Sequence, residues 1–278
     1  MSSFAQVIAL LGLPFDASST YLRGPAQAPA LIRAALASDS SNSWTEDGVD
    51  LGLDGPIHDA GDLELPENSE QSLLLIERRV SDLLALGHPL ICLGGDHSVT
   101  YPILRGFRQH FSNLTILHFD AHPDLYHELN GELSHACPFA RIMENGLARR
   151  LVQVGIRTIN QHQFDQARKF GVEVISMRHR DRLAGLKLEG PVYVSLDLDV
   201  LDPAFAPGVS HYEPGGMSVR EVLDAVQSVR VPVVGADIVE YNPTRDRDGQ
   251  TAMVCAKLLK EIAAAMLRRG NPPRQDWV

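Results

Sequence analysis

The sequence is poor in cysteine and in long apolar runs, and each shortage excludes a class of protein. Its three cysteines, Cys92, Cys137 and Cys255, form no CxxC pair, which is typical of reduced thiols in a cytosolic protein. We therefore expect a cytoplasmic location. No stretch approaches the ~20 consecutive apolar residues that a membrane-spanning helix needs, so no membrane partner is expected.

Basic charge is also scarce. The chain has 25 Lys and Arg against 35 Asp and Glu, a formal net charge of −10. Because nucleic-acid binding needs a basic face, nucleic acid is excluded as the main partner. The acidic excess suits a small cationic substrate or a bound metal, although many cytosolic enzymes are acidic for solubility alone. The N-terminal MSSFAQVIALLGLPFD lacks a basic segment before its apolar stretch, which predicts a first strand and not a signal peptide.

Short apolar runs alternate with helix-like stretches along the chain. Near-continuous runs of Val, Ile and Leu are typical of parallel strands buried on both faces, and they occupy 7–12, 89–95, 114–119, 151–156, 172–176, 191–200 and 231–239. Helical spacing and capping predict helices over 67–87, 218–230 and 248–269. The pattern predicts one α/β domain over 1–278. Only 38–70, rich in Ser, Asp and Gly, is expected to be an irregular surface excursion.

Three polar motifs lie at the ends of three of these runs: LGGDHS (93–98), HFDAHPD (118–124) and SLDLDVLDP (195–203). In open parallel sheets, ligands bind outside the carboxyl ends of the strands, so the motifs should meet at one edge. Side chains two residues apart point to the same side of an extended segment. The edge would then offer two imidazoles and four carboxylates, from His97, Asp120, His122, Asp124, Asp197 and Asp199.

Four carboxylates in one pocket require cations. At an effective dielectric constant of 20, two of them about 4 Å apart repel by roughly 4 kcal/mol. Two divalent ions would neutralise all four, and carboxylate-rich ligation with some imidazole suits manganese better than zinc, with iron, cobalt and nickel left open. Such a pair can activate a shared water, which predicts hydrolysis at a planar or phosphoryl centre. A single His or Asp would more often cap a turn, but six at three strand ends favour a metal site.

Together, GGDHS, DAHPD and SLDLDVLDP resemble the signature motifs of the ureohydrolase family of arginases and agmatinases. The stretches 134–157, 202–218 and 237–246 are most similar to plant-type, agmatinase-like arginases. The resemblance implies a three-layer α/β/α fold with a central, mostly parallel sheet, two Mn²⁺ per subunit, and a homo-oligomer that is a trimer or a hexamer. It implies release of urea from a small cationic guanidino substrate. L-arginine is the first expectation, with agmatine or another guanidino compound as the alternative.

The resemblance also implies roles for individual residues. One manganese would be bound by His97 and Asp124, the other by His122 and Asp199, and both by Asp120 and Asp197. A hydroxide between the ions would attack the guanidinium carbon. His135, in SHACPF, matches the family's proposed proton shuttle, and histidine titrates in the range that this role needs. Glu240, in VEYNP, matches the glutamate that pairs with the guanidinium, a group suited to bidentate carboxylate binding.

The loop 125–134 departs from the plant-type pattern, because Asn130 precedes Gly131 and Glu132 follows it. The far end of the substrate should be read here, and Asn130 is the predicted contact. The loop holds no Lys or Arg for a substrate carboxylate, whereas Glu128 and Glu132 could attract an amine. The sequence of the loop therefore does not distinguish arginine from agmatine as the substrate. His211 receives no chemical role.

Two other classes fit the sequence less well. A binuclear metallophosphoesterase needs further His-rich motifs, such as a GHxH near the C-terminus, which the chain lacks. A non-enzymatic relative should have lost a metal ligand or the glutamate, and all of these residues are present. Activity on guanidino compounds would separate the first hypothesis from both others.

Overall fold

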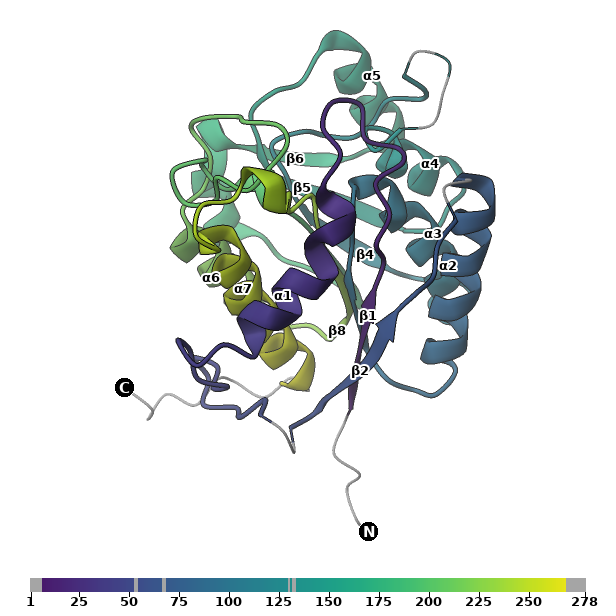
Figure 1. The fold of residues 1–278 in the computed structure, drawn as a ribbon. Helices are drawn as coiled ribbons and strands as arrows, with labels where there is room; N and C mark the ends of the chain where they lie inside the picture. Colours follow the sequence, from purple (N-terminus) through teal and green to yellow (C-terminus); the bar gives the residue numbers. More distant parts are fainter. Residues whose placement is uncertain (1–6, 53–54, 67–68, 130, 132–133, 269–278) are drawn as a thin grey trace.

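A parallel sheet of eight strands forms the centre of the molecule, with helices on both faces (Figure 1). The computed structural model describes residues 7–52, 55–66, 69–129, 131 and 134–268. The sheet order is β2-β1-β3-β8-β7-β4-β5-β6. The strands are β1 (Ile8–Gly12), β2 (Ile57–Asp62), β3 (Leu90–Leu93), β4 (Thr115–Phe119), β5 (Arg150–Ile156), β6 (Glu173–Ser176), β7 (Val192–Asp197) and β8 (Val233–Val239).

The helices divide into two layers. Buried side chains of α1 (Ala28–Leu36), α6 (Val219–Ser228) and α7 (Gln250–Leu267) belong to one apolar cluster. Those of α2 (Ser69–Leu84), α3 (Thr100–Arg108), α4 (Pro138–Glu144) and α5 (Gln161–Phe170) belong to the other. Figure 1 shows α1 and α7 together on one side of the sheet and α2 and α3 on the opposite side. The predicted three-layer α/β/α fold is therefore confirmed.

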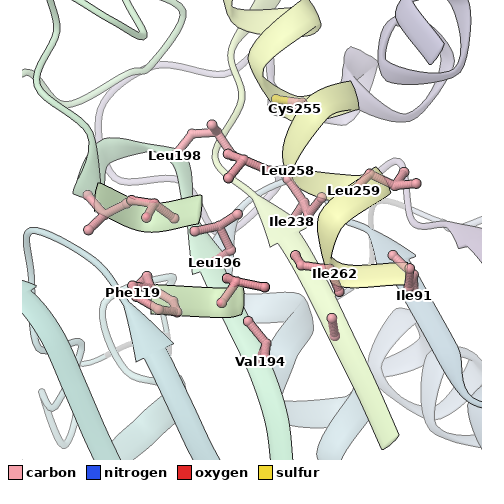
Figure 2. Close-up of a cluster of buried hydrophobic side chains, with 14 of the residues drawn as sticks. Ile91, Phe119, Val194, Leu196, Leu198, Ile238, Cys255, Leu258, Leu259 and Ile262 are labelled. Carbon is pink, nitrogen blue, oxygen red and sulfur yellow. The ribbon is translucent and has the colours of Figure 1, made fainter. Parts of the chain in front are cut away.

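Alternation along the strands explains why the apolar runs are continuous. In β1, Ile8 and Leu10 pack in the cluster with α1 and α7, whereas Ala9 and Leu11 pack in the cluster with α2 and α3. Both faces of the strand are buried, so every position is apolar. Figure 2 shows the first cluster, where Leu258, Leu259 and Ile262 of α7 lie over the strands.

All seven predicted strands are present, with ends shifted by up to three residues, and so are the three predicted helices. The prediction for 38–70 is wrong in part, because this stretch contains the edge strand β2, which pairs with β1. The residues of β2 are mostly polar and exposed, so the sequence has no apolar run that would predict a strand there. Residues 41–46 also pack on α7, where Lys260 donates to the carbonyl of Asn42 (2.8 Å) and Glu261 accepts from the N–H of Glu46 (2.9 Å). Within the described ranges, no helix is long and apolar enough to cross a bilayer.

Gly95 of the LGGDHS motif allows two segments of backbone to pass close together. A Cβ added there would overlap the carbonyl oxygen of Phe15. We expect Gly95→Ala to lower the free energy of unfolding by about 1–3 kcal/mol, as overpacking against backbone does, and to displace the turn that carries His97. Urea denaturation measures the change. Gly185→Ala is the control, because an added Cβ there meets nothing within 4 Å. Equal stability of the two variants would contradict the prediction.

Candidate metal centre

Four neighbouring strands, β3, β8, β7 and β4, end beneath the candidate site. His97 opens a 3₁₀ turn, His97–Val99, just after β3. Glu240 follows β8, and Asp120 follows β4. Asp197 is the last residue of β7. The central position of these strands brings the three motifs to one edge, as the sequence predicts.

Tight turns, and not an extended strand, produce the two-residue spacing within the motifs. Asp120 Oδ1 accepts a hydrogen bond from the backbone N–H of His122 (2.5 Å), and Asp197 Oδ1 accepts one from that of Asp199 (2.8 Å). Asp124 has a φ of 49°, in the left-handed region that few non-glycine residues adopt. The predicted convergence is found, but the predicted reason is wrong, because the chain turns out of the sheet at both aspartates.

The first group of donors surrounds His97. Its Nδ1 lies 3.2 Å from Asp120 Oδ2, 3.1 Å from Asp124 Oδ2 and 3.2 Å from Asp197 Oδ2. In the described part of the chain this buried nitrogen nevertheless has no hydrogen-bond partner of acceptable geometry. One imidazole nitrogen and three carboxylate oxygens that converge without a hydrogen bond fit the donor set of a divalent cation.

The second group lies beside the first. His122 Nδ1 is 3.0 Å from Asp199 Oδ2 and 3.5 Å from Asp120 Oδ1. Asp120 therefore takes part in both groups, one through each oxygen, as its predicted bridging role requires. Asp197 approaches His97 through Oδ2, but among the described residues no ion pair joins it to His122. The bridging role of Asp197 stays a prediction.

Burial and mutual repulsion oppose the ionisation of two of these carboxylates, Asp124 and Asp197. Burial, with the charge of Asp120 added, raises the pKa of Asp124 to about 6. Burial, with the charges of Asp199 and Asp120, raises the pKa of Asp197 well above its ordinary value. Nearby positive charge would reverse both shifts. The electrostatics and the donor chemistry therefore agree that the residues fit two divalent cations.

Glu240 and His135 form a buried pair next to the first group. Glu240 Oε1 accepts from the backbone N–H of His97 (2.9 Å) and lies 2.7 Å from His135 Nδ1. The backbone N–H of Thr20 donates to His135 Nε2 (3.2 Å), so Nδ1 carries the proton that reaches Glu240. Burial lowers the pKa of His135, but the negative charge of Glu240 outweighs it and raises the pKa to about 9. The Thr20 N–H donates to Nε2 and opposes protonation at that atom, whereas Glu240 favours the protonated ring.

A buried polar chain behind His97 is absent from the sequence-based prediction. His97 Nε2 lies 3.0 Å from Ser195 Oγ, which donates to Asp237 Oδ1 (2.7 Å). Asp237 Oδ2 accepts from Tyr193 (2.7 Å) and Thr100 (2.8 Å). The chain fixes the ring orientation of His97, with Nδ1 toward the carboxylates. Two polar residues inside otherwise apolar strands, Ser195 in β7 and Asp237 in β8, could have indicated this chain from the sequence.

An open cleft of about 280 Å³ lies over the two groups. Glu240, His135 and His211 line it, together with Tyr126 and Leu129 of the 125–134 loop. The His211 ring lies 5.4 Å from that of His135, and its buried Nε2 has no hydrogen-bond partner among the residues described. Asn130, the predicted substrate contact, falls outside the described residues.

Comparison with known proteins gives relatives over nearly the whole chain. "Arginase 1, mitochondrial" from Arabidopsis thaliana is 48% identical over 273 residues, covering 92% of this chain and 80% of the relative. "Agmatinase" from Bacillus anthracis is 34% identical over 264 residues, covering 92% and 90%. The solved structure of the arginase from Medicago truncatula superimposes with a TM-score of 0.90 at 43% identity, covering 95% of this chain and 89% of that one.

The names of the plant relatives correct the expected cytoplasmic location. The Arabidopsis protein is named as mitochondrial, and further plant relatives are named as mitochondrial or chloroplastic. The expectation rested on three unpaired cysteines. Such cysteines indicate a reducing environment, but they do not distinguish one reducing compartment from another.

The family assignment rests on a match along almost the entire sequence. The model of the arginase family matches residues 6–265. This range includes all three motifs, His135 and Glu240, together with every strand of the sheet. The chain therefore belongs to the arginase family.

Proposed function

We propose that the protein is a manganese-dependent arginase, which hydrolyses L-arginine to L-ornithine and urea. One observation carries the proposal: four of the six ligand-type side chains line a single cleft together with Glu240 and His135, and the other two, His97 and Asp120, contact members of these four directly. Family membership supports hydrolysis of a guanidino C–N bond. The greater identity to a protein named arginase, 48% against 34% for one named agmatinase, favours arginine as the substrate.

Six residues would hold two Mn²⁺ per chain, with Asp120 shared between them: His97, Asp120, His122, Asp124, Asp197 and Asp199. When bound, the ions supply Lewis-acid activation of a water nucleophile near neutral pH. The protein supplies the fixed positions. Ser195 and Asp237 orient His97, and the Ala121 N–H donates to Asp199 Oδ1 (3.0 Å), which joins the second motif to the third.

Glu240 binds and orients the guanidinium of the substrate. Its Oε1 is engaged by His97 and His135, whereas its Oε2 accepts no hydrogen bond from any described residue. Because Glu240 lines the cleft, this oxygen is available to the N–H groups of a planar cation. The positive φ of Glu240, 63°, directs the residue out of β8 and marks a local backbone cost at the site.

His135 transfers a proton to the amine that leaves the tetrahedral carbon. The ring lies in the cleft and its Nδ1 is hydrogen-bonded to Glu240, so Nε2, which Thr20 contacts in this structure, is the atom that would carry the transferred proton. Proton delivery matters because an unprotonated amine is a poor leaving group.

The far end of the substrate would lie between the 125–134 loop, where the sequence predicts it, and the amino end of α5, where Asn160 donates to the Tyr126 hydroxyl (2.6 Å). Thr158, Asn160 and Gln163 line this part of the cleft. The Gln163 side chain is 5% exposed and makes no hydrogen bond to the described residues, so its amide is free to bind a polar group. The amino end of a helix favours negative charge, which supports a substrate with a carboxylate, as in arginine.

Urea release by the manganese-loaded protein tests this proposal. L-arginine, agmatine, 4-guanidinobutyrate and guanidine are compared side by side, with chelator-treated protein as the blank. We expect kcat/KM for L-arginine to exceed that for agmatine by about 10-fold or more, because a hydrogen bond to a charged group contributes about 1.5–3 kcal/mol. Preference for agmatine would reassign the substrate. No urea from any of the four, with two metals bound, would refute the reaction class.

We also propose a homo-oligomer, a trimer or a hexamer, as the family resemblance implies. Light scattering of the purified protein gives the mass in solution. A monomer of about the chain mass, 30.5 kDa, would contradict this proposal without affecting the assignment of the reaction.

A further inference from the structure

His118 is the first residue of the HFDAHPD motif, and the proposed function gives it no role. Its side chain is fully buried in β4, beneath Asp120. The ring stacks on Phe139, with centroids 3.8 Å apart and planes at 25°. Nε2 lies 2.8 Å from Asp120 Oδ2, and Nδ1 lies 3.1 Å from the side-chain nitrogen of Gln153. Gln153 is the direct neighbour of His118 on the adjacent strand β5.

Hydrogen-bond chemistry fixes the proton on this ring. The Gln153 side-chain nitrogen lies 2.6 Å from the carbonyl oxygen of Pro123, which can only accept, so the amide group of Gln153 can take only this orientation. The second N–H of the same nitrogen then donates to His118 Nδ1. A nitrogen that accepts carries no proton, so the proton is on Nε2 and is donated to Asp120.

This arrangement holds the shared carboxylate at both oxygens. Asp120 Oδ1 accepts from the His122 N–H, and Oδ2 accepts from His118. With both oxygens engaged, the carboxylate plane cannot rotate freely. Gln153 also holds the carbonyl of Pro123, the residue before Asp124, whose φ is 49°. One amide on β5 therefore steadies two predicted ligands of the same metal group.

We propose that His118, oriented by Gln153, is a positioning residue that fixes the bridging carboxylate of Asp120 for metal binding. This inference rests on the proposed metal centre. His118 is not itself a ligand in this proposal, because one ring nitrogen faces Gln153 and the other donates to Asp120. Substitution of His118 should therefore weaken Mn²⁺ binding but leave the number of metal sites per chain unchanged.

Three substitutions of His118 separate positioning from packing. The amide nitrogen of glutamine lies about where Nε2 lies, whereas that of asparagine lies near Nδ1. H118Q therefore keeps the donor to Asp120, H118N loses it, and H118F keeps only the contact with Phe139. We expect Mn²⁺ affinity to fall by about 10–100-fold in H118N and H118F, and much less in H118Q. Free Mn²⁺ is followed by electron paramagnetic resonance during titration, and bound metal is counted by elemental analysis.

A matched pair of glutamine variants tests the second half of the proposal. Q153L removes the group that orients His118 and should weaken Mn²⁺ binding. Q166L removes a buried glutamine on α5 that does not line the cleft, and it should leave Mn²⁺ binding unchanged. Circular dichroism of the metal-free proteins tests whether each variant is folded. If H118F does not fold, the comparison of H118N with H118Q and that of Q153L with Q166L still test the proposal.

The outcomes distinguish this inference from the proposed function. If H118F binds Mn²⁺ as well as H118Q, or if Q153L matches Q166L, the positioning role is overturned. If H118Q binds one ion where the wild type binds two, His118 is a ligand and the inference is also overturned. Wild-type protein that fails to bind two ions would refute the proposed metal centre first.

Discussion

Asp120→Asn is expected to reduce the bound manganese below two ions per chain and to lower kcat/KM for urea release by about 10³-fold. Among the residues that the structure describes, Asp120 is the one carboxylate that approaches both His97 and His122, so its loss affects both groups of donors. An amide keeps the size of the side chain but removes its charge. Since Lewis-acid activation by bound ions contributes several kcal/mol, loss of their position costs about three powers of ten in rate.

The measurement combines elemental analysis after gel filtration with a urea assay. Asp165→Asn is the matched control, because Asp165 is an exposed aspartate on α5. A protein that keeps two ions and full activity after Asp120→Asn would refute the metal assignment. We further expect the variant to be less stable than the wild type without metal, because burial raises the pKa of Asp120 but the hydrogen bonds from His118 and His122 outweigh it and hold this pKa well below its ordinary value.

Glu240→Gln should abolish most turnover while leaving the metals bound. Glutamine can still accept from the His97 N–H and from His135 through its oxygen, so the local structure is kept. It presents a donor amide to the guanidinium in place of the free Oε2. Losing a buried charged partner costs about 3–5 kcal/mol, which corresponds to about 10²–10⁴-fold in kcat/KM for arginine.

Glu189→Gln, at an exposed position, is the control for the loss of a glutamate. Manganese content and melting temperature are measured with the kinetics. If Glu240→Gln keeps wild-type kinetics, the guanidinium is bound elsewhere in the cleft. If it loses manganese, Glu240 supports the ligands through the His97 N–H, and its effect on turnover would not identify a substrate contact.

Much of the fold could be predicted, because burial on both faces makes parallel strands apolar throughout. Ile8 to Leu11 illustrates this, since alternate residues enter opposite clusters and none is polar. The edge strand β2 escaped prediction because its faces are largely exposed, and Ile57–Asp62 therefore reads as a polar turn-rich segment. The helices α1, α3 and α4 were not predicted because they are nine residues or shorter, and α5 was not predicted although Asn160 and Gly171 cap its ends, because its sequence is largely polar.

The residue types of the metal centre could be predicted, but not the contacts that orient them. Asp120 with His122, and Asp197 with Asp199, are close in sequence, and each pair meets through a local turn. Thr20 and His135 are 115 positions apart, and Ser195 and Asp237 are 42 apart. Only strand order brings them together, and a sheet with a different order would separate them.

The sequence by itself determined which side chains could bind metal, which strands would carry them, and the family to which the chain belongs. Local spacing and apolar patterning are sufficient for this, since both are set by neighbours along the chain. The tertiary structure alone decided that Asp120 joins two donor groups, that Asp237 anchors His97 through Ser195, and that Gln153 orients His118. These contacts cross between strands far apart in sequence, so their geometry depends on how the whole sheet is assembled.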